Sequence, residues 1–154
     1  VLFRSVRELP TLGQLKHAEK GLIWALVHNS SEGLAALAEL DEDDISHLAG
    51  REVFRAALEL RASTPPAGLP SALLQRLSTV DAQLLTAVAA GEKAPAKPAD
   101  CARALRRLRF ERERAALQRE IDRLQELGAG QHDRQIDDLW RKKKELLHQI
   151  EHLT

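Results

Sequence analysis

The segment from Asp100 to Leu127 runs for 28 residues without a glycine or a proline. It consists mainly of Ala, Leu, Arg, Glu and Gln, which are strong helix formers. At 1.5 Å per residue it predicts a helix of about 40 Å. Such a helix is long for a small globular domain, so it restricts the folds that the rest of the chain can adopt.

The apolar residues of this predicted helix change face along its length. When residues are placed at about 100° each, one side carries the apolar residues of the first half, Cys101, Leu105 and Leu108. The roughly opposite side carries those of the second half, Phe110, Leu117, Ile121 and Leu124. We therefore expect the first half to pack on one unit of the protein and the second half on another.

Residues 14–90 predict a compact bundle of five or six short helices. Their apolar residues recur at three- and four-residue spacing, which gives each helix one apolar face that it cannot bury alone. Asp41 or Asp44 can cap a brief helix, and Gly50 can close that helix in the left-handed conformation. The segment GEKAPAKPA, residues 91–99, is predicted to be a connector, and Asp100 a cap for the long helix at 100–127.

Residues 128–154 begin with a turn and predict a last helix that forms an antiparallel hairpin with the long one. The apolar residues of this last helix have near-heptad spacing, interrupted only by Lys143: Ile136, Leu139, Trp140, Leu146, Leu147, Ile150 and Leu153. The predicted fold class is all-α, with a bundle, a long helix and a C-terminal helical hairpin. Residues 1–13 lack a helical pattern and are interpreted as a cloning remnant or a linker from a missing upstream region.

A two-helix hairpin has too little interior to bury every apolar residue of its last helix. We expect Trp140 to pack against Phe110 or Leu117, and the surplus to face outward as anchors for a partner. The residues predicted to bind that partner are Ile136, Leu139, Trp140, Lys143, Leu147 and Ile150.

No catalytic, cofactor or metal site is predicted. Cys101 lies on the apolar face of its predicted helix, and we expect it to be a small, buried, apolar side chain. The run of acids from Asp41 to Asp44 is normal for a first helical turn, and His148 with His152 lacks the further ligands that zinc requires. The chain itself is therefore not expected to be an enzyme, nor to bind a small-molecule substrate.

Overall charge and composition bear on which partners and which cellular compartment to expect. The formal net charge is zero, so no overall field attracts the chain to nucleic acid or to an anionic membrane. No apolar run has the length of a membrane span, and a single cysteine fits a reducing compartment. The expected location is the cytoplasm.

Six arginines between Arg103 and Arg114 raise a second possibility, a nucleic-acid-binding helix. They are spread around the helix axis and are interrupted by Glu111 and Glu113, and no aromatic side chains are interleaved. A solvated helix with ion pairs at i,i+4 spacing is the preferred interpretation. Direct nucleic-acid contact is therefore not expected, and nucleic-acid binding through residues 103–114 is kept as the alternative.

The order of segments resembles the C-terminal region of bacterial DNA primases of the DnaG type over about residues 14–154. The segments that carry the resemblance are AEKGLIWALVHNSSEGLAAL, ISHLAGREVFRAALELRA, LPSALLQRLSTVDAQLLTAVAA, DCARALRRLRFERERAALQREIDRLQELG and IDDLWRKKKELLHQIEHL.

The resemblance implies a helical bundle joined by a long helix to a terminal hairpin. It also implies docking of primase on the N-terminal domains of the replicative DnaB-type helicase, which couples primer synthesis to unwinding. Primase catalysis, with its zinc and magnesium, would lie upstream of this region. A hairpin that dimerises through its own apolar face is a third, weaker hypothesis.

Overall fold

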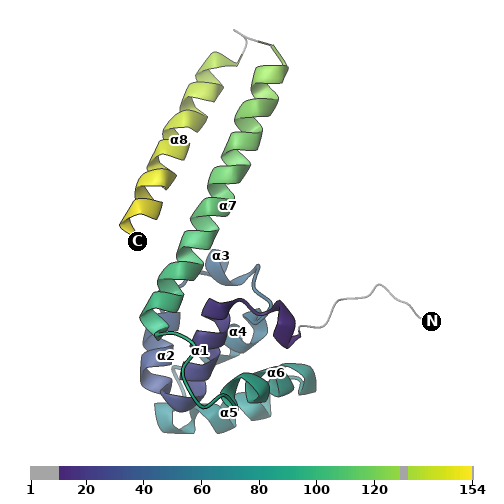
Figure 1. Ribbon diagram of the computed structural model, residues 1–154, viewed down its shortest axis with the longest axis vertical. Helices are drawn as coiled ribbons and strands as arrows, with labels where there is room; N and C mark the ends of the chain where they lie inside the picture. Colours follow the sequence, from purple (N-terminus) through teal and green to yellow (C-terminus); the bar gives the residue numbers. More distant parts are fainter. Residues whose placement is uncertain (1–10, 129–131, 154) are drawn as a thin grey trace, which may run out of the picture. The chain divides into compact units, whose positions relative to one another are not determined.

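The computed structural model describes residues 11–128 and 132–153, and every regular element in these ranges is helical (Figure 1). The all-α prediction is therefore confirmed. The chain divides into two compact units, Val1–Ala102 and Arg103–Thr154. The division falls inside the long helix, whose first residues thus belong to the first unit and the remainder to the second.

The first unit is a bundle of short helices. Six α-helices and two 3₁₀ helices are described in it: η1 (Leu12–Gln14), α1 (His17–His28), α2 (Ser30–Leu37), α3 (Glu42–Ile45), α4 (Arg51–Leu60), η2 (Pro66–Gly68), α5 (Leu69–Arg76) and α6 (Thr79–Ala89). Part of the segment interpreted as a remnant or linker is ordered, because Thr11 N donates to Gln14 Oε1 at 3.1 Å across η1. Residues 1–10 lie outside the described ranges.

Helix α1 lies at the centre of this bundle, where it contacts α2, α4, α5 and α6. Its apolar residues Leu22, Ile23 and Leu26 are fully buried. Their three- and four-residue spacing places them on one side of the helix. The neighbouring helices and the segment between α3 and α4 add the other large core side chains. These are Leu37, Ile45, Leu48, Phe54, Leu69, Leu73 and Leu85.

Asp41 was read correctly as the start of a helix. Asp41 precedes α3, and its backbone N–H donates to Asp44 Oδ2 at 2.8 Å; the acidic run is thus a helix start. Gly50 was misassigned, because its φ of −87° is not left-handed and it serves as the N-cap of α4. The only positive φ among the described residues belongs to Gly128, at 130°.

A buried carboxylate joins the starts of α1 and α4. Glu19 is fully buried; its Oε2 accepts from Lys16 N at 2.8 Å and its Oε1 from Gly50 N at 2.8 Å. Both donors belong to N-terminal backbone that has no partner within its own helix. A single side chain therefore satisfies backbone groups that are 34 residues apart, and it does so out of contact with water.

The end of α6 and the start of the connector at 91–99 are each held against α1 by one hydrogen bond. Trp24 Nε1 donates to Gly91 O at 2.9 Å, and His28 Nε2 lies 2.7 Å from Ala89 O at the end of α6. The Trp24 and His28 rings are stacked, with centroids 4.2 Å apart. Because carbonyls at a helix C-terminus lack partners within the helix, His28 supplies a partner at the end of α6, and Trp24 binds the backbone just beyond it.

The long helix α7 (Pro98–Glu126) starts directly against α1. A Cβ added to Gly21 would lie 2.4 Å from Cys101 Sγ and 3.3 Å from Ala96 O. Only glycine at this position therefore lets the first turns of α7 approach so closely. Asp100, predicted to be the cap, lies instead within the first turn of α7, because the helix begins two residues earlier at Pro98.

The second unit is a helical hairpin. It consists of α7 from Arg103 onward and α8 (Asp133–His152), which runs back beside α7 (Figure 1). Phe110, Ile121 and Leu124 of α7 are buried, as is Ile150 of α8. The predicted last helix thus begins at Asp133, and residues 129–131 of the turn lie outside the described ranges.

We expect Glu19→Gln to lower the free energy of unfolding of the bundle by about 2 kcal/mol, because the amide can accept from only one of the two backbone donors. Urea denaturation followed by Trp24 fluorescence, in a Trp140→Phe background, would measure the change. The matched control is the exposed Glu39→Gln, for which a change within about 0.5 kcal/mol is expected. Equal effects of the two substitutions would contradict the role given to Glu19.

Gly21→Ala is expected to destabilise the bundle by about 1–3 kcal/mol, because its methyl group overlaps Cys101 Sγ. In a Cys101→Ala background the overlap disappears, and alanine should then stabilise α1 by about 0.5–1 kcal/mol relative to glycine. A double-mutant cycle measured by urea denaturation would reveal this change of sign. Additive effects would show that the two residues do not meet.

Candidate protein-binding surface

A polar contact fixes the register of the hairpin. Lys143 Nζ donates to Gln118 Oε1 in a half-buried position between the two helices. Because α7 and α8 run in opposite directions, Trp140 then lies level with Ile121, and Glu151 level with Phe110. The lysine that interrupts the apolar pattern therefore has a partner across the hairpin.

The residues predicted to bind a partner do not form one exposed face. Ile150 is buried and Lys143 is half-buried against α7, so both belong to the hairpin itself. Ile136, Leu139 and Leu147 are half-buried. Trp140 differs from the rest, with 43% of its surface exposed.

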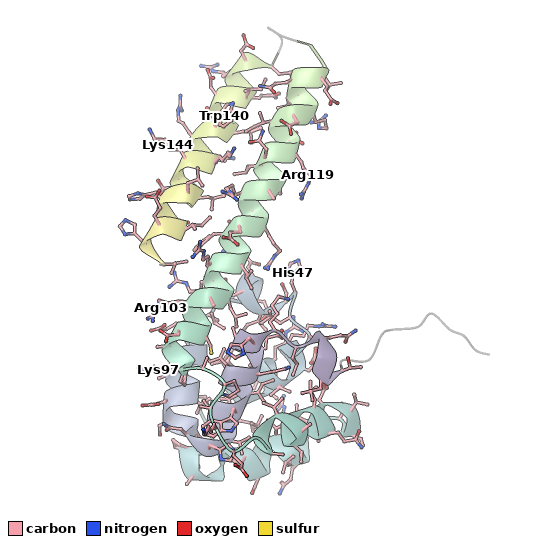
Figure 2. The ribbon with its side chains drawn as sticks, in the orientation of Figure 1. His47, Lys97, Arg103, Arg119, Trp140 and Lys144 are labelled. Carbon is pink, nitrogen blue, oxygen red and sulfur yellow. The ribbon has the colours of Figure 1, made fainter. Side chains whose placement is uncertain are left out.

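Figure 2 labels Trp140 on α8. Its ring centroid is 4.6 Å from Lys143 Nζ, a cation–π contact. The register separates it from Phe110 by eleven residues of α7, or about 16 Å. Trp140 was predicted to pack against Phe110 or Leu117; this register is incompatible with Phe110, and packing against Leu117 stays a prediction. The guanidinium of Arg109 lies over the face of Phe110, 4.5 Å from the ring centroid.

The hairpin also contains an apolar groove that was not predicted. The groove has a volume of about 530 Å³ and is lined by Glu113, Ala116, Leu117, Lys142, Glu145, Leu146 and Gln149. Ala116 and Leu117 on α7 and Leu146 on α8 supply its apolar lining. The sequence signal was Ala116, whose short side chain leaves space beside a helix that presents leucine.

The groove and Trp140 lie on different flanks of the hairpin. Trp140 and Leu146 are six residues apart, which is about 120° around α8, and Ile150 and Lys143 lie between them. The hairpin therefore offers two separate apolar features, an exposed aromatic ring and a shallow hydrophobic groove. Both are features through which protein surfaces bind other proteins.

The arginine-rich part of α7 carries ion pairs along the helix. Arg107 Nε lies 3.2 Å from Glu111 Oε1, and Arg109 Nη1 lies 3.3 Å from Glu113 Oε1, both at i,i+4 spacing. Phe110 is only 7% exposed, so it offers no face on which a base could stack. These contacts favour a solvated, ion-paired helix.

The described residues contain no group of three or more His, Cys, Asp or Glu side chains that could hold a metal ion. Cys101 is buried, and burial followed by the nearby Asp100 charge raises the pKa of its thiol to about 11. The thiol is thus protonated at neutral pH and is not the thiolate that nucleophilic chemistry requires.

The searches against known proteins return nothing: no family model, no curated protein and no solved structure matches the chain. Among the helices that the structure describes, none has the length and apolar character needed to cross a membrane.

Two truncations in the hairpin should lower its stability by very different amounts. Ile121→Ala removes a fully buried side chain and is expected to destabilise the hairpin by about 2–5 kcal/mol. Trp140→Ala removes a partly exposed one and should cost less than about 1 kcal/mol. Amide hydrogen exchange resolved by mass spectrometry would report the loss of protection in α8. Comparable losses in both variants would mean that Trp140 is a core residue of the hairpin.

Proposed function

We propose that this chain is a protein-docking module whose α7–α8 hairpin binds the partner. The observation that carries the proposal is Trp140, a large aromatic side chain held on a compact hairpin and 43% exposed. Tryptophan is enriched among the residues that contribute most to binding at protein interfaces. The groove beside Leu117 and Leu146 adds apolar surface on the other flank.

The partner that we propose is the N-terminal part of a replicative DnaB-type helicase. This step rests on the resemblance of residues 14–154 to the C-terminal region of DnaG-type primases. The arrangement of a helical bundle, a long helix and a terminal hairpin is compatible with that resemblance. Docking would then couple RNA primer synthesis to DNA unwinding.

In this proposal the chain contributes recognition rather than chemistry. A parent primase would carry its nucleotidyl-transfer machinery, and the zinc and magnesium that serve it, upstream of this chain. The binding free energy at the hairpin would come from burying Trp140 and the groove residues. The ion-paired arginines of α7 would keep the helix solvated rather than contact nucleic acid.

The test is binding of the chain to the helicase N-terminal domains, measured by isothermal titration calorimetry. We expect Trp140→Ala to weaken binding at least about tenfold, as removal of a central aromatic anchor does. Arg141→Ala is the matched control, because Arg141 is adjacent, 80% exposed in its side chain and paired only weakly with Asp138 at 3.4 Å. Deletion of residues 128–154 should abolish binding.

A folded chain that does not bind the cognate helicase would end the helicase proposal. The nucleic-acid alternative has its own signature in a titration with fluorescent single-stranded DNA. Binding through the arginines would weaken steeply with salt and would be lost when Arg106, Arg112 and Arg114 are changed to glutamine. Salt-dependent DNA binding of that kind, without helicase binding, would favour the alternative.

A further inference from the structure

The last two turns of α8 carry a pair of histidines with their ring nitrogens together. His148 and His152 are one helical turn apart, and their Nε2 atoms are 3.0 Å apart. The ring centroids are separated by 4.4 Å with an interplanar angle of 85°, so the rings meet edge to face. The two nitrogens thus converge on one point beside the helix.

We propose that His148 and His152 bind one first-row divalent transition-metal ion, Cu²⁺ most tightly, in a site that is open to solvent. Imidazole nitrogens lie about 2.0–2.1 Å from such an ion. Two of them at right angles around the ion are about 2.9 Å apart, and at a tetrahedral angle about 3.4 Å apart. The observed separation of 3.0 Å falls within this range.

The packing of Ile150 keeps this pair accessible and aligned. Ile150 is buried, with 7% of its surface exposed, and it lies two residues from each histidine. Two residues correspond to about 200° around a helix, so the pair is on the face of α8 opposite Ile150. Burial of Ile150 therefore fixes the helix with both rings exposed to solvent.

The metal replaces a hydrogen bond rather than a buried contact. When one ring carries its proton on Nε2 and the other on Nδ1, the first Nε2 can donate a hydrogen bond to the second, since 3.0 Å is a hydrogen-bond distance. Metal binding needs the lone pair of both Nε2 atoms. The donor ring therefore moves its proton to Nδ1 through solvent, and both neutral imidazoles then coordinate the ion.

The ligand set indicates which ion is held and what it does. Residues 148–152 read His-Gln-Ile-Glu-His, but a catalytic zinc centre needs three protein ligands, and the described residues offer no group of three. Water must complete the coordination, which Cu²⁺ and Ni²⁺ accept in tetragonal sites, and Cu²⁺ binds nitrogen ligands most tightly of the series. The bound ion would link two successive turns and stabilise the end of α8.

This site is independent of the proposed docking function. Trp140 lies eight residues before His148, two turns further along α8. A metal-binding result therefore does not bear on helicase binding. If either proposal fails its test, the other proposal is unaffected.

The experiment titrates the untagged full chain with Cu²⁺ in a non-chelating buffer, by calorimetry and by electron paramagnetic resonance. We expect one ion per chain with two nitrogen ligands. His148→Gln and His152→Gln should each weaken binding roughly 10²-fold, because the second imidazole is already held beside the ion. The resonance spectrum should then show one nitrogen ligand, while His17→Gln and His47→Gln should bind as the unaltered chain does.

Far-UV circular dichroism checks that the glutamine variants keep their helix, which the exposure of both positions leads us to expect. Equal Cu²⁺ affinity in the unaltered chain and in both His148 and His152 variants would overturn the proposal. Absence of saturable binding, or a spectrum with one nitrogen ligand in the unaltered chain, would also overturn it. The spectrum of the unaltered chain decides the question even if a variant fails to fold.

Discussion

The starts of α1 and α4 are joined by one buried carboxylate, that of Glu19. Glu19 is out of contact with water, and burying a carboxylate is unfavourable unless hydrogen bonds replace its hydration. Both of its oxygens do accept, from Lys16 N and Gly50 N, each at 2.8 Å. Because these donors begin α1 and lead into α4, the charge holds two helix starts in one place. The core residues around α1 then pack on a frame whose geometry is already fixed.

The presence of the helices could be predicted from the sequence, because helix formation depends on local residue patterns. The spacing of Leu22, Ile23 and Leu26, and the Ser78 side chain that accepts from Asp81 N at 3.2 Å, are signals within a few residues. Glu19 has no such signal, since its position in the helix looks like that of any first-turn acid. Its partner Gly50 is 31 residues away, and only the tertiary fold brings the two together.

The same limit explains the misreading of Gly50, and Gly21 provides a second example of it. A glycine near a helix end suggests a left-handed cap, yet Gly50 is placed by its contact with a carboxylate. A glycine inside a helix suggests only a loss of stability, yet Gly21 leaves room for Cys101. In both cases the reason for the glycine lies in a remote segment, which residue spacing does not reveal.

In the hairpin, Lys143 interrupts the heptad pattern of apolar residues in α8, and this residue determines how the two helices align. A polar residue among heptad positions reduces stability but selects one register, and Lys143 does so through Gln118. That register places Trp140 level with Ile121 and away from Phe110. The predicted partner residues were therefore a mixture: Ile150 serves the interior, and Trp140 remains available. Burial, which decides between these roles, depends on the register and not on the heptad position alone.

The charge of the hairpin helps to decide between nucleic-acid binding and protein binding. Residues 103–154 contain 13 Lys and Arg and 10 Asp and Glu, an excess of three positive charges. Some of these charges are neutralised locally, as in Arg107–Glu111 and Arg109–Glu113. A nucleic-acid site needs several cations free to replace counterions at successive phosphates, and the pairing of Arg107 and Arg109 reduces the positive charge that α7 can offer. Apolar contact has no such requirement, because its strength depends on the area that Trp140 and the groove remove from water.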